Sequence, residues 1–178
     1  MMTPIEDIYE FHRVRTACHI AALNWFANLL NLHFPEHDND KNVEPMRTGY
    51  AYKNYSAYHP RYKLPANYDD LFEIAKDTHH GHASHHVDFY GGDVSKIPNI
   101  YLLEMICDWA SANFEQVFVL RDYEFETVWE WFNVRMEHLN WTDKQLKTIR
   151  ETTEFLEKHM DKEALIQIWQ PVLEKSDL

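Results

Sequence analysis

The chain has 178 residues, about one domain's worth, of which 45% are hydrophobic and 26% charged, a composition typical of a folded globular protein rather than a disordered one. Its formal charge of −12 argues against a nucleic-acid polymer as partner, because such proteins usually carry a basic surface. No apolar run approaches the ~20 residues that span a membrane, no signal-peptide profile opens the chain, and the two cysteines lie inside helical patterns, so we expect a reducing, cytoplasmic location.

The first predicted helix covers residues 3–32. Its opening Thr-Pro-Ile-Glu is typical of a capping box with proline at the first helical position, and apolar residues then recur at helical spacing. His12, Arg15 and His19 follow one another at steps of three and four residues, so we expect them to share one face of this helix.

Residues 33–68 are predicted to be non-helical. Pro35 breaks the first helix, and a short polar segment follows. Residues 49–68 carry six tyrosines and two prolines without a clear period, which indicates a long ordered loop. The tyrosines fit either a lid packed by aromatic contacts, which we favour, or a surface that stacks on a nucleobase.

The rest of the chain is predicted to be helical, with no strand of period two, so the fold class is all-α. We expect one domain of six or seven helices over residues 1–178. The acidic C-terminal helices fit either a solvated face or a homodimer surface. One helix is expected to start at Asn67 or Asp69, a second to run from Asn99 to about Val119, and a third to cover 121–139. A fourth is expected to open with a capping box at Thr142-Asp-Lys-Gln145, and a short last helix is kinked or ended by Pro171.

Histidine is the unusual residue of this chain: 12 occur, and five of them fall between His79 and His86. Imidazoles and carboxylates suit Zn, Fe or Mn, and no cysteine is placed for a closed structural zinc site. Glu104 and Asp108 lie four residues apart on an apolar helix, where a buried carboxylate needs a metal or a metal-bound histidine as partner. The residues that could carry chemistry are therefore His19, His37-Asp38 with Lys41, the cluster 79–86, and Glu104 with Asp108.

The order of these residues resembles the H…HD…D signature of the HD-domain superfamily, whose members are all-α metal-dependent phosphohydrolases. His37 to Lys41 also has the HDxxK spacing of several branches. The chain is still more similar to a small uncharacterised bacterial and phage family with the pattern HDxSK, a glutamate, HH and EMxxDW. That resemblance covers roughly residues 10–115, with Asp40 standing where the family tends to have serine.

The resemblance implies one or two divalent ions (Mn, Fe, Mg, Zn or Co) and a small phosphorylated substrate such as a nucleotide. The lack of a long apolar run separately argues against a membrane partner. Asp38 and Lys41 would be the catalytic residues, with Lys41 contacting a substrate phosphate as a point charge. Asp38 would also bridge the two ions. Arg15, Lys53 or Arg61 could assist with the phosphate. The other implied ligands are His19, His37 and Asp108 for one ion, and His80 with His85 or His86 for the other.

Three functions stay open from sequence alone. The leading hypothesis is a metal-dependent phosphohydrolase; a di-iron oxygenase on the same fold is the second, because the extra histidines allow a six-ligand set. A non-enzymatic module that binds a metal, ligand or partner is the third. Simpler interpretations also exist: His19 alone fits a hydrogen-bonded core histidine, and the cluster 79–86 fits a solvated, pH-responsive loop or a metal-scavenging tract.

Overall fold

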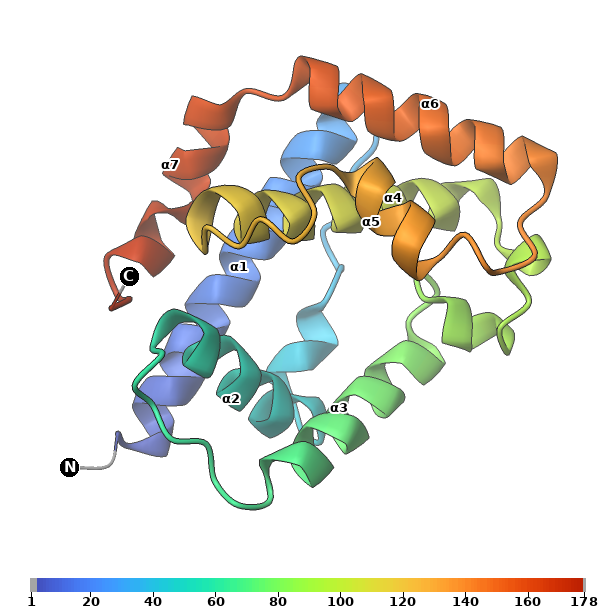
Figure 1. Ribbon diagram of the computed structural model, residues 1–178. Helices are drawn as coiled ribbons and strands as arrows, with labels where there is room; N and C mark the ends of the chain where they lie inside the picture. Colours follow the sequence, from blue (N-terminus) through green and yellow to red (C-terminus); the bar gives the residue numbers. More distant parts are fainter. Residues whose placement is uncertain (1–2, 178) are drawn as a thin grey trace.

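The computed structural model describes residues 3–177, which form seven α-helices and no strand, so the predicted all-α fold of one compact domain is confirmed (Figure 1). Three 3₁₀ turns, η1 (Asn39–Asn42), η2 (Val87–Tyr90) and η3 (Val94–Lys96), lie between helices, and a π-helical turn, η4 (Glu115–Val119), continues α4. The helices are α1 (Ile5–Leu29), α2 (Met46–Tyr58), α3 (Tyr68–His82), α4 (Asn99–Phe114), α5 (Val128–Arg135), α6 (Asp143–His159) and α7 (Lys162–Leu173).

Helix α1 is the central element, and α2, α4 and α7 all pack against it. Helix α3 packs on α2, and α6 packs on α4, so Figure 1 shows α2 and α3 together at one end of α1 and α6 near the other. No helix within residues 3–177 is both long enough and apolar enough to cross a bilayer. The core between the helices contains large, fully buried side chains: Phe26, Leu102, Ile106, Phe114, Phe132 and Trp169.

Helix α2 replaces the first half of the ordered loop predicted for residues 49–68, so that prediction is wrong there. Gly49 lets α2 approach α3 closely, because a Cβ at this position would lie 2.4 Å from the Leu71 carbonyl oxygen. Tyr50 and Tyr58 are buried, and their packing outweighs the weak helix propensity of tyrosine and glycine. The tyrosines do pack through aromatic contacts, but on a helix rather than on a lid.

Several helix ends depart from the sequence prediction. The capping box predicted at Thr3 is wrong, because Pro4 is the residue before α1 and no side chain caps the helix. Helix α5 begins at Val128 rather than near residue 121, because Thr127 and Glu130 form a capping box that was not predicted. Pro171 lies inside the last turn of α7. The capping box between Thr142 and Gln145 is confirmed at the start of α6.

Candidate metal centre

The candidate site lies where four segments of the fold meet. Helix α1 contributes His19, α4 contributes Glu104 and Asp108, and the segment before η1 contributes His37 and Asp38. The last turn of α3 and the loop after it contribute the histidines at 79, 85 and 86. Helices α1 and α4 pack on each other, and His19 and Asp108 meet between them at 2.9 Å.

Asp38 is the centre of this arrangement. Its backbone is left-handed (φ 58°, ψ 7°), a conformation that aspartate adopts more readily than most residues. Its Oδ1 lies 3.2 Å from His79 Nε2 and 3.6 Å from His37 Nε2, while its Oδ2 lies 3.6 Å from His19 Nε2. Lys41 Nζ also donates a hydrogen bond to Oδ2, at 2.6 Å. Asp38 therefore faces histidines from several segments with its two oxygens.

The first group of possible ligands lies between α1 and α4 and consists of Asp38, His19, His37 and Asp108. Asp108 Oδ1 lies 2.9 Å from His19 Nε2 and 3.6 Å from His37 Nε2. The Ser111 hydroxyl lies 3.0 Å from His19 Nδ1 and 3.1 Å from the His19 carbonyl oxygen, so a hydroxyl that donates to the carbonyl can accept from Nδ1–H. His19 Nε2, which faces Asp108 and Asp38, would then be the atom that binds a metal ion.

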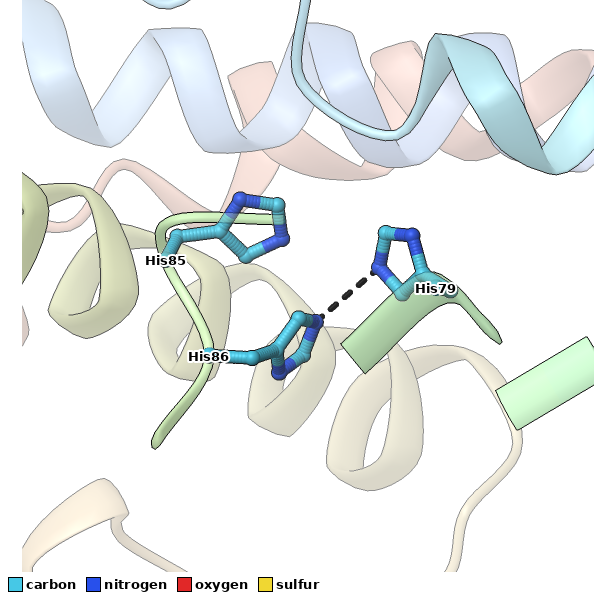
Figure 2. Close-up of side chains that lie close together, drawn as sticks. All are labelled: His79, His85 and His86. Carbon is cyan, nitrogen blue, oxygen red and sulfur yellow. Dashed lines mark hydrogen bonds between the residues drawn. The ribbon is translucent and has the colours of Figure 1, made fainter. Parts of the chain in front are cut away.

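The second group consists of His79, His85 and His86, whose rings turn toward one another (Figure 2). His79 comes from the end of α3, and the other two come from the loop that follows. His79 Nε2 lies 2.9 Å from His86 Nε2, and His85 Nε2 lies 3.7 Å from Asp38 Oδ1. Three imidazoles beside one carboxylate form a donor set that suits Zn, Fe or Mn.

Two further carboxylates hold these histidines from outside. Glu104 Oε1 lies 3.0 Å from His37 Nδ1 and 3.5 Å from His85 Nδ1, and Asp40 Oδ2 lies 2.7 Å from His79 Nδ1. A carboxylate can only accept, so Nδ1 of His37 and of His79 carries the proton. The Nε2 atoms of these two histidines consequently face Asp38, which is the orientation that metal-binding histidines usually have.

Three buried atoms at the centre of the site have no hydrogen-bond partner within residues 3–177: His37 Nε2, Asp38 Oδ1 and His85 Nε2. An unpartnered buried polar group costs about 1–3 kcal/mol. These three atoms point toward one another, and a cation would be a partner for all of them. The residues present therefore fit a bound metal ion.

The electrostatics of the two carboxylates agree with that fit. Burial opposes ionisation of Asp38, but the charges of Lys41 and His37 hold its pKa well below the usual range. Burial also opposes ionisation of Asp108, but the adjacent imidazoles of His19 and His37 keep its pKa well below the usual range too. Both groups are carboxylates at neutral pH, as metal ligands must be. Burial opposes protonation of His37, but the charge of Asp38 raises the pKa of this imidazole to about 10, so a metal ion would displace the proton on Nε2.

The structure brings together all but one of the predicted ligands. His80 is set apart, since its Nδ1 lies 2.9 Å from Asp88 and its ring stacks on His86 with the centroids 4.0 Å apart. His79, which the sequence analysis did not single out, lies against Asp38 instead. The sequence held one sign that His79 is buried: it lies one helical turn after Ala75, so the two residues share the buried face of α3.

Three cavities border the site, and they differ in character. The carboxylate-lined cavity, of about 440 Å³, carries Glu36, Asp38, Asp40 and Glu104, and no lysine or arginine of residues 3–177 lines it. The cation-lined cavity, of about 280 Å³, carries Arg15, Lys41 and Lys53 beside His19 and Asp108. The aromatic cavity, of about 460 Å³, carries Met105, Trp109, Trp131 and Met136 beside His85, His86 and Asp108.

Comparison with known proteins gives one match. A family model described as a family of unknown function (DUF5662) matches residues 9–162, a range that includes every candidate ligand. No curated protein and no solved structure matches the chain.

Proposed function

The chain belongs to the DUF5662 family of unknown function, and we propose from its site that it is a metal-dependent phosphohydrolase of the HD-domain type, acting on a small phosphorylated compound. The observation that carries this proposal is the convergence of five histidines on Asp38 and Asp108 directly beside a cation-lined cavity. Nitrogen and carboxylate donors suit a divalent metal, and the neighbouring cations suit an anionic substrate.

Two metal ions would share Asp38 in this proposal. The first would be held by His19, His37 and Asp108, and the second by the three histidines of the second group. When bound, such ions lower the pKa of a coordinated water and offset the charge that develops on phosphoryl oxygens.

Lys41 is the side chain best placed to bind a phosphoryl oxygen. Its Nζ is held by Asp38 and lies 4.8 Å from the centre of the Tyr50 ring, at the wall of the cation-lined cavity. A lysine is a compact charge that suits a phosphate oxygen. Arg15 and Lys53 line the same cavity and add positive charge around the anion. Arg61, the third residue considered from sequence, does not line it.

A di-iron oxygenase is the second candidate, and the three imidazoles of the second group favour it, because such a set prefers iron to magnesium. Metal analysis of the protein as isolated separates the two functions. Two irons per chain with a mixed-valence signal indicate oxygen chemistry, whereas activity that depends on manganese, cobalt or magnesium indicates hydrolysis.

The proposal is tested by phosphate release from nucleotides and other phosphoesters by the purified protein loaded with Mn, Fe, Co or Mg. We expect release that depends on the metal and disappears in Asp38→Asn. Asp70→Asn is the matched control, because Asp70 is exposed and lines none of the three cavities. Full metal loading without phosphate release would contradict the proposal and would leave the di-iron oxygenase and the non-enzymatic binding module.

A further inference from the structure

The aromatic cavity touches both groups of candidate metal ligands. Asp108 of the first group lines it, and so do His85 and His86 of the second. Trp109 of α4 and Trp131 of α5 also line it, with their ring centroids 5.3 Å apart. An apolar group bound there would therefore lie directly beside the candidate metal centre.

The aromatic cavity also adjoins the cation-lined cavity. Asp108 and Ala112, which are one turn apart on α4, line both of them. A single molecule that passes Asp108 would thus have positive charge at one end and tryptophan rings at the other. No lysine or arginine within residues 3–177 lines the aromatic cavity, so its lining suits an anionic group less than that of the cation-lined cavity.

One cation of the cation-lined cavity lacks an acidic partner. Arg15 forms a two-armed ion pair with Glu115, which also accepts a hydrogen bond from the Tyr58 hydroxyl at 2.7 Å. Lys41 is paired with Asp38. Among residues 3–177, no carboxylate lies within 4.0 Å of Lys53 Nζ, which lies 4.9 Å from the centre of the Phe72 ring. Lys53 is therefore the charge most available to an anion.

On the basis of the proposed phosphohydrolase function, we propose that the substrate is a phosphate monoester with one anionic end and one flat apolar end. Its phosphate group contacts Lys53 and Lys41 in the cation-lined cavity. Its apolar group, aromatic in character, occupies the aromatic cavity against Trp109 and Trp131, where aromatic rings pack favourably. Phosphate esters of small polar alcohols would leave that cavity unfilled and would bind more weakly.

Binding of two hydrolysis-resistant phosphonates tests this inference. Calorimetry on the manganese-loaded protein compares 1-naphthylmethylphosphonate with methylphosphonate, which share the anionic group and differ in the apolar one. We expect the naphthyl compound to bind at least about tenfold more tightly. Lys53→Met should weaken both compounds by a similar factor, because it removes charge that both of them use.

Variants of residues that line the aromatic cavity test whether the preference for the naphthyl compound arises there. Trp131→Ala should reduce it to less than about threefold and leave methylphosphonate binding unchanged. Trp129→Ala is the matched control, because Trp129 lies on the same helix but stacks on Phe132 and does not line the cavity. Met136→Gln, at a partly exposed position, provides a second variant should Trp131→Ala not fold.

The outcomes separate this inference from the function on which it rests. Equal affinity for the two phosphonates, no binding of either, or a preference that survives both Trp131→Ala and Met136→Gln would overturn the inference. Because a phosphonate is not turned over, none of these results depends on catalysis. Tight, Trp131-dependent binding without phosphate release from any ester would instead overturn the phosphohydrolase function.

Discussion

The carboxylate-lined cavity and the cation-lined cavity border the same cluster of histidines with opposite charge. Glu36, Asp40 and Glu104 line the first, whereas Arg15 and Lys53 line the second. In the proposed function, such a separation would let a metal ion and an anionic substrate reach the cluster through different cavities, each with a field of favourable sign. The overall charge of −12 therefore argues more strongly against a polyanionic partner than against the proposed small phosphate ester.

The largest effect on this comparison is expected from removing the negative charge of Asp38. Asp38→Asn leaves the shape of the side chain but deletes the shared ligand and the partner of Lys41. We expect metal affinity to fall by more than ~100-fold, since losing only an outer partner of a ligand typically costs 10–100-fold. Calorimetric titration with Mn²⁺ measures it, and an affinity within threefold of the wild type would contradict the account.

On the cation-lined side, Glu115→Gln should cost about 3–5 kcal/mol in the free energy of unfolding at pH 7. The change leaves Arg15, which is largely buried, without its carboxylate partner. Urea denaturation followed by circular dichroism measures the loss. Glu126→Gln, at an exposed site, is the control and should change little.

The pH dependence of that loss has a definite sign. Burial raises the pKa of Glu115, but Arg15 outweighs burial and brings the pKa below its ordinary value of 4.5. Ionised Glu115 therefore stabilises the fold fully above that ordinary value and loses its contribution as the pH falls through the lower folded pKa. The difference between wild type and Glu115→Gln should narrow as the pH falls from about 4.5 to 3. An unchanged difference over that range would be evidence against the ion pair.

On the carboxylate-lined side, Glu104→Gln should weaken metal binding by about 10–100-fold, because an amide no longer fixes His37 and His85 as firmly. Manganese affinity measured by calorimetry checks this expectation. Glu36→Gln is the matched variant, since Glu36 lines the same cavity without holding a ligand histidine. If the two variants behave alike, general negative charge rather than histidine orientation matters on this side.

The contact between α2, which lines the cation-lined cavity, and α3 is tested by a smaller change. Gly49→Ala should cost about 1–3 kcal/mol in the free energy of unfolding, because the added Cβ would press on the Leu71 carbonyl and push α2 from α3. Gly81→Ala is the control, with nothing within 4 Å of its added Cβ. Thermal unfolding of both variants checks the difference, and equal melting temperatures would contradict this helix contact.

The sequence predicted those site residues that can be recognised by their type and by their order along the chain. His19, His37, Asp38 and Asp108 were singled out by their order, and the structure brings them together. To predict that His79 rather than His80 faces Asp38, one must know which side of α3 faces the core. That orientation is set by how α3 packs on α2. Helix α2 itself was missed because its stability comes from tertiary packing rather than from propensity.

The central claim is that two metal ions bind at Asp38, and the anomalous scattering of crystals grown with Mn²⁺ tests it most directly. The account predicts two peaks that both adjoin Asp38. One should lie among His19, His37 and Asp108, and the other among His79, His85 and His86. Crystals of fully loaded protein with no peak beside Asp38 would contradict it.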